Sequence, residues 1–150
     1  MSNVILQGNA SGTGTTTLQS SNTNSTTTLT LPEPVENVTL GYLNVPQNSQ
    51  SGAYTLVLAD AGKQIFHPSA DTTARTFTIP ANSSVPYPVG TAITFINQNA
   101  AGVVTISITS DTMRLAGAGT TGSRTLAANG IATCVKVTST EWIISGTGLT

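Results

Sequence analysis

The fold class can be predicted from residues Arg75–Ile108, RTFTIPANSSVPYPVGTAITFINQNAAGVVTISI. Within it, apolar side chains recur at every second position in the runs 75–79, 91–96 and 104–108. A period of two is typical of a strand with one face buried and the other face exposed. The separators at 80–90 and 97–102 are rich in Pro, Gly and Asn, which are turn-forming residues. The stretch therefore predicts consecutive strands joined by short loops, as in an antiparallel all-β domain.

The same alternation recurs on both sides of this stretch. Further strands are expected at 36–40, 54–58, 63–66, 112–115, 124–126, 131–137 and 141–144, with a polar loop at 44–52. The pair Asn129-Gly130 is a hairpin signal, because both residues readily adopt positive φ. Many short strands at near-regular spacing predict an antiparallel sandwich or barrel, jelly-roll-like, over residues 35–150.

The composition narrows the class of partner. Charged residues make up 7% of the 150-residue chain, against about 25% in typical soluble domains. Hydrophobic residues reach 38%, which supports folding rather than disorder. The formal net charge of −1 offers no electrostatic footprint for nucleic acid or for an anionic membrane. No run approaches the roughly 18 apolar residues of a membrane span. We therefore expect neither nucleic acid nor membrane as a partner.

The leader, residues 1–34, differs from the rest of the chain. It carries no charge before Glu33 and is rich in Thr, Ser and Asn, a β-prone and neutral composition. Such a segment suits an extended arm that adds a strand to a partner's sheet, although a leader without a role is the simpler alternative. The expected partner-binding anchors of the arm are its apolar side chains, Val4, Ile5, Leu6, Leu18, Leu29 and Leu31.

Few residues suggest catalysis or the binding of a metal or cofactor. Cys134 is the one cysteine and lies in an alternating run, so a buried apolar role is expected. His67, Ser69 and Asp71 are close in sequence, but a catalytic triad needs convergence in space and an oxyanion hole. We expect His67 to be a loop residue satisfied by a neighbour. No ligand cluster has metal-binding spacing, so no catalytic residue, metal or cofactor is predicted.

Aromatic side chains such as Trp142 and Tyr87 could form a sugar-stacking platform. Trp142 lies in an alternating run next to two isoleucines, which favours a place in the core. Tyr87, between Pro86 and Pro88, is the better candidate for an exposed contact residue.

Several motifs of the body resemble the small β-domains of tailed-bacteriophage virion proteins, including head-decoration (cement) proteins and tail-fibre modules. These motifs are DAGKQI (60–65), TFTIPA (76–81), PVGTAITFIN (88–97), LAANG (126–130), VKVTSTEW (135–142) and ISGTG (144–148). The leader is also similar to the N-terminal arms of such proteins. The resemblance implies a non-enzymatic virion structural protein, often trimeric, and carries no catalytic residue with it.

The leading functional hypothesis is a capsid decoration protein that binds the outside of the head and bridges capsomers. Its partners would be the major capsid protein and, in a homotrimer, itself. The opening residues lack a basic segment followed by an apolar core, so synthesis in the host cytoplasm before assembly on the virion is expected. The alternatives are a tail-fibre or baseplate component, a carbohydrate-binding module using Trp142, Tyr87 and the 80–90 loop, and a hydrolase using His67.

Overall fold

A computed structural model of the protein describes residues 44–98 and 101–150, all within one compact unit, Gly41–Thr150. Its regular structure is almost entirely β, which confirms the predicted all-β class. The strands are β1 (Gln47–Ser49), β2 (Tyr54–Thr55), β3 (Gln64–His67), β4 (Arg75–Ile79), β5 (Ala92–Asn97), β6 (Val104–Ile108), β7 (Thr112–Leu115), β8 (Arg124–Lys136) and β9 (Glu141–Leu149), with a 3-10 turn, η1 (Leu58–Asp60). The arm predicted over 1–34 and the strand predicted at 36–40 lie outside the described residues.

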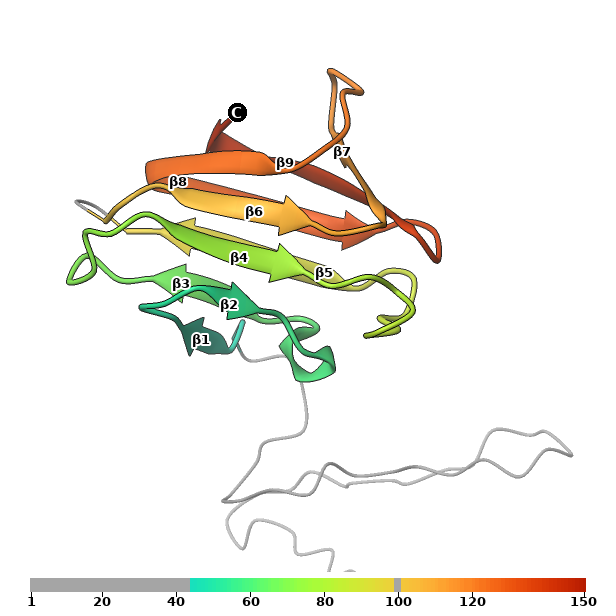
Figure 1. Ribbon diagram of the computed structural model, residues 1–150, viewed down its shortest axis with the longest axis horizontal. Coiled ribbons are helices and arrows are strands. Elements are labelled where there is room, and N and C mark those ends of the chain that lie inside the picture. Colours follow the sequence, from blue (N-terminus) through green and yellow to red (C-terminus); the bar gives the residue numbers. More distant parts are fainter. Residues whose placement is uncertain (1–43, 99–100) are drawn as a thin grey trace, which may run out of the picture. The chain divides into compact units, whose positions relative to one another are not determined.

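Strands β1 to β6 form two parallel stacks. The odd-numbered strands pair in the order β1, β3, β5, and the even-numbered strands in the order β2, β4, β6. Each connecting loop therefore carries the chain from one stack to the other, so that two successive strands make one coil. Figure 1 shows the coils lying one on another in a strongly curled sheet, with β2, β4 and β6 in front of β1, β3 and β5.

The last strands close one end of this arrangement. β8 pairs antiparallel with β6 through its first part and with β5 through its last part, so it joins the two stacks. β9 pairs antiparallel with β8 and parallel with β7. At the opposite end, β1 and β2 each have one strand neighbour in the part of the chain that the structure describes. At one end of the body β8 therefore joins the two stacks, whereas the strand edges of β1 and β2 at the other end are open; among the residues described, β7 also has one strand neighbour, β9. We call the end formed by β8 and β9 the capped end.

The expected antiparallel pairing and jelly-roll-like connection are wrong for most of the sheet. Strands β1 to β6 never pair with the next strand along the chain, and all of their mutual pairings are parallel. The loops between them were expected to be short connections of an antiparallel domain. Instead they cross to the opposite stack, which is how parallel neighbours must be connected. The predicted sandwich or barrel is confirmed to the extent that the curled sheet places the two stacks on opposite sides of one core.

The predicted hairpin at 127–130 is also wrong, because β8 runs through it without reversing. Asn129 does adopt a positive φ of 64°, but within a bulge where the pairing with β9 shifts register between Leu126 and Ile131. A Cβ at Gly130 would lie 2.7 Å from the Ala127 carbonyl oxygen, so the bulge requires glycine there. This irregularity lets one strand bend from β6 on one stack to β5 on the other.

The core lies between the two stacks. Ile65, Ile93 and Phe95 point inward from β3 and β5, and Phe77 and Ile106 from β4 and β6, all fully buried. The alternation seen in the sequence thus assigned the inward face of these strands correctly.

Trp142 and Cys134 confirm their predicted core positions. Both are fully buried, and the Cys134 Sγ lies 3.9 Å from the Met113 Sδ. Burial raises the pKa of the Cys134 thiol to about 12, which keeps it protonated and unreactive in the folded protein.

Candidate functional site

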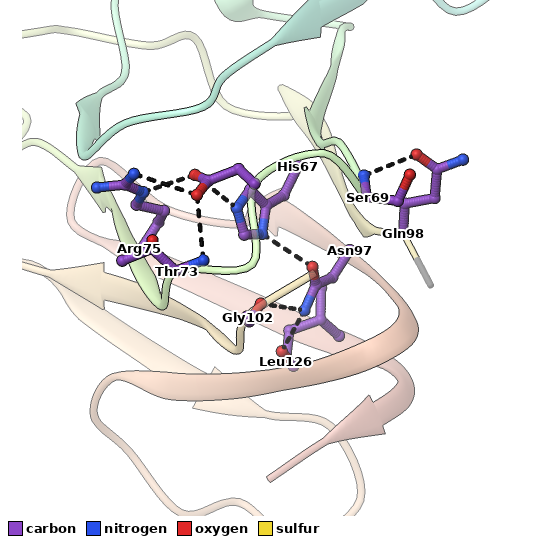
Figure 2. A network of polar contacts seen from close by, with 9 residues as sticks. His67, Ser69, Thr73, Arg75, Asn97, Gln98, Gly102 and Leu126 are labelled. Carbon is purple, nitrogen blue, oxygen red and sulfur yellow. Dashed lines mark hydrogen bonds and ion pairs between the residues drawn. The ribbon is translucent and has the colours of Figure 1, made fainter. Parts of the chain in front are cut away.

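The most connected polar group of the body lies where β3 and β5 end. His67 and Asn97 are the last residues of these strands and are register partners in the parallel pairing. Both side chains are fully buried on the inward face, where alternation would otherwise place an apolar residue. The His67 Nδ1 lies 2.9 Å from the Asn97 Oδ1. A buried polar pair therefore continues the core up to the end of the coil (Figure 2).

Asn97 orients the histidine ring. The Asn97 Nδ2 donates to the Gly102 carbonyl at 2.9 Å and to the Leu126 carbonyl at 3.1 Å, which leaves Oδ1 to face His67. The other ring nitrogen, Nε2, lies 3.1 Å from the Asp71 Oδ2. Both ring nitrogens of His67 thus have a polar partner, the Asn97 amide on one side and the Asp71 carboxylate on the other.

Asp71 extends the network to the loop between β3 and β4. Its carboxylate accepts from the Arg75 Nε at 2.6 Å and Nη2 at 3.2 Å, and from the Thr73 N–H at 3.1 Å. The Arg75 guanidinium, together with the Thr73 N–H and His67, holds the pKa of the Asp71 carboxyl well below its usual range against a smaller opposing effect of burial. Asp71 is therefore ionised at neutral pH, and its charge fixes the loop against the start of β4.

The network ties together two loops and β8. The Gly102 N–H donates to the Asp71 carbonyl at 3.4 Å, and the Gln98 Oε1 accepts from the Ser69 N–H at 2.9 Å. At Gly102 a Cβ would lie 2.3 Å from the Thr73 carbonyl carbon, so only glycine allows the two loops to approach this closely. These contacts lock the end of the coils at which the chain passes between the stacks.

The geometry disfavours a hydrolytic triad. His67 and Asp71 do meet, as their spacing suggested, but both ring nitrogens of His67 already face Asn97 and Asp71. No ring nitrogen is left to take a proton from the Ser69 hydroxyl, as the general base of a triad must. His67 is satisfied by its neighbours, as expected, although it ends a strand and is not in a loop. The network holds structure and does not present a nucleophile.

We expect the stabilisation by Asp71 to depend on pH. Because its pKa is depressed in the folded protein, its contribution is complete above the ordinary aspartate pKa of about 4 and is lost as the pH falls below it. The free energy of unfolding of the wild type should exceed that of Asp71→Asn at neutral pH, and the difference should shrink between about pH 5 and pH 2. Denaturant titrations at a series of pH values measure this. A difference that stays constant with pH would contradict the role of the charge.

A second polar cluster surrounds Lys136 on the inner face of β8. Its side chain is 1% exposed, its Nζ donates to the Asn82 Oδ1 at 2.5 Å, and the Nζ lies 5.5 Å from the centre of the Trp142 ring. The Asn82 N–H in turn donates to the Asp111 Oδ2 at 3.0 Å. The cluster holds the long loop between β4 and β5 against the capped end of the sheet.

The predicted exposure of Tyr87 is wrong. Its side chain is 3% exposed and packs edge-on against Trp142, with ring centres 5.5 Å apart. The Tyr87 hydroxyl donates to the Val57 carbonyl at 2.6 Å, and burial raises the pKa of this hydroxyl. The flanking prolines suggested an exposed loop, but the loop folds back over the core. Neither aromatic face is available for a sugar, which removes the basis of the proposed glycan platform.

The predicted arm anchors Val4, Ile5, Leu6, Leu18, Leu29 and Leu31 lie outside the described residues. Among residues 44–98 and 101–150, the structure contains no group of His, Cys, Asp and Glu that could hold a metal ion. The same part of the chain contains no helix long and apolar enough to span a membrane.

No protein-family model matches the chain, and no curated protein matches it.

Proposed function

We propose that this protein is a non-enzymatic structural subunit of a tailed-phage particle, namely a capsid decoration protein. Residues 35–150 would be displayed on the head, and the leader, residues 1–34, would bind the major capsid protein and bridge capsomers. A homotrimer is proposed because the phage virion proteins that the sequence resembles are often trimeric. The observation that carries the proposal is the polarity of the body: β8 and β9 cap one end, while Asn44 leads into β1 at the end with open strand edges. Under this proposal the chain before Asn44 attaches to the particle, and the end formed by β8 and β9 is displayed.

The chemistry of the leader suits attachment by main-chain pairing. Its Thr-rich sequence supplies backbone donors and acceptors, and its scattered Val, Ile and Leu supply small apolar anchors. A standard interface of about 1,600 Å² would suffice, because symmetry repeats it over the particle. Since the leader is almost uncharged, its binding should change little with salt concentration.

The polar network supports a structural role. His67, Asn97 and Asp71 hold loops to strands with their hydrogen-bonding groups. Buried groups that are satisfied by each other fix one conformation and reduce local opening. This suits a domain that must withstand exposure on the outside of a particle.

Deleting residues 1–34 is expected to abolish binding to particles that lack this protein while leaving the body folded. The fully buried core residues that the structure describes all belong to the body, so the truncated protein should keep the circular dichroism spectrum and cooperative melting of the full chain. Co-sedimentation with undecorated particles measures the binding. As a matched control in the full chain, Leu29→Asp with Leu31→Asp is compared with Thr28→Asp and Thr30→Asp on the alternate positions. Saturation of the particles by the truncated body would contradict the proposal.

A tail-fibre component is the second candidate, and the stacked coils favour it. Coils that pair in parallel can be extended by further coils at an open edge, and repeat arrays end in a capping element. A body capped by β8 and β9 is what the tip of such an array requires. Labelling intact particles with an antibody to this protein distinguishes the candidates, because the head is labelled in one case and the tail in the other.

A further inference from the structure

The two stacks have outer faces of different chemistry. On the side of β2, β4, β6 and the first part of β8, the outward positions of the register rows carry hydroxyl side chains. The first row is Thr55, Thr78 and Ser107, and the second is Thr76, Thr105 and Thr125. Threonine is a strong strand former that also tolerates water, so this face is suited to solvent.

The opposite outer face, on β1, β3, β5, β8 and β9, carries apolar side chains. Its register rows are Ala92, Val135 and Ile143; then Gln47, Gln64, Thr94, Thr133 and Ser145; then Ser49, Phe66, Ile96, Ile131 and Thr147. We call this surface the apolar face. Ile131 is 48% exposed, Val135 36% and Ile143 37%. Two rows with apolar side chains thus flank a central row of hydroxyl and amide side chains.

The rows across β1, β3, β5, β8 and β9 carry no charged side chain, but the row of Ile143 continues on β7 with Arg114. The charges nearest to it in register are Arg114 and Glu141 at its rim, and the Arg114 Nε donates to the Glu141 Oε1 at 2.7 Å. Lys136 lies on β8 within the same region but points inward. Because Arg114 and Glu141 pair with each other, this face has no unpaired charge to repel its own copy, and the net charge of −1 adds little repulsion between whole chains.

The contrast between the faces excludes strand propensity as the reason for the apolar residues. Threonine, which fills the other outer face of the same sheet, would serve β structure at Ile131, Val135 and Ile143 equally well. Leaving Ile and Val in water forgoes the hydrophobic free energy that their burial would provide. We propose that the apolar face is covered by a second copy of this chain. This inference concerns a two-fold pair of copies, which is separate from the homotrimer proposed above, and it does not depend on attachment to a particle.

The arrangement of the rows suits a second copy in particular. The face has two rows with apolar side chains, and between them lies the central row of hydroxyl and amide side chains. A half-turn about an axis along the central row therefore exchanges the two apolar rows and leaves the central row in place. Two copies can therefore place apolar rows on apolar rows, and the Thr94–Thr133 row on itself, where hydroxyl and amide groups can pair. With strands about 4.8 Å apart, five strands span about 20 Å, a width that can supply the centre of a stable interface.

The test compares the full chain with the triple variant Ile131→Thr, Val135→Thr, Ile143→Thr. These substitutions copy the chemistry of the opposite face and keep β-branched side chains, so the strands should be retained. Sedimentation equilibrium from roughly 1 to 100 μM should show the wild type as an assembly of copies and the triple variant with a dissociation constant raised at least roughly a hundredfold. The measurement is made without particles, so it fails or succeeds independently of the capsid proposal.

The matched control removes similar exposed apolar surface elsewhere on the body. Val57→Thr, Val89→Thr and Val103→Thr replace side chains that are 47%, 63% and 46% exposed and lie outside the apolar face. This control should assemble as the wild type does. A wild type that is monomeric at about 100 μM would overturn the inference, whether or not the triple variant folds. So would a folded triple variant that assembles as tightly as the control.

Discussion

Replacing Phe77 by alanine is expected to lower the free energy of unfolding by about 3–5 kcal/mol. Phe77 is fully buried on β4, pairs in register with Tyr54 and Ile106, and meets the His67 ring edge-on at 6.1 Å. It therefore links one stack to the other, and its loss would leave a cavity that rigid strands on both sides cannot close. The expected loss is a large share of the roughly 5–15 kcal/mol that stabilises a typical domain.

Equilibrium denaturation in urea measures this effect, and Thr76→Ala is the matched control. Thr76 is the preceding residue on the same strand, but it points outward and is exposed. Its replacement should change the free energy of unfolding by no more than about 0.5 kcal/mol. If Phe77→Ala cost as little as Thr76→Ala, the core would not lie between the two stacks.

The second large effect is expected at Asn97, where leucine should cost about 3 kcal/mol or more. The substitution removes three hydrogen bonds, and leaves the Gly102 carbonyl, the Leu126 carbonyl and the His67 Nδ1 without their partner. Each buried polar group that loses its partner costs about 1–3 kcal/mol. Leucine adds apolar side-chain surface in a buried position, but this gain does not offset the unpaired groups.

Gln98→Leu provides the comparison for Asn97→Leu. Gln98 is the next residue and also carries an amide, but it is exposed. Its side chain accepts a hydrogen bond from the Ser69 N–H. Its replacement should cost about 1 kcal/mol or less. Thermal and denaturant unfolding of both variants measure the difference, and equal losses would show that the Asn97 network contributes nothing beyond an ordinary surface contact.

Part of the polar network could be predicted from the sequence. The spacing of four residues points to a contact between His67 and Asp71, and the sequence predicts that His67 is satisfied by a neighbour. The role of Asn97 is not predicted, although this residue continues the inward positions of Ile93 and Phe95 with a polar side chain. Its partner His67 is 30 residues away, and only the parallel register of β3 and β5 brings the two together.

Sequence alternation alone predicted most strands and the buried side of β4, β5 and β6. It missed β1, which lies within the expected loop 44–52, and on β8 the more apolar side, with Ile131 and Val135, is the exposed one. This information is local, because side chains alternate across a strand and the apolar set must face inward. It placed Phe77, Phe95 and Ile106 in the core without reference to any partner strand.

Which strands are neighbours follows from tertiary contacts and not from local sequence. Parallel stacking of β1 to β6, the bulge at Asn129 and the burial of Tyr87 all depend on where each loop delivers the next strand. A loop that reverses the chain and a loop that crosses to the opposite stack can have the same turn-forming composition. The difference in free energy between them arises from contacts between residues far apart in the chain, and local alternation carries no information about those contacts.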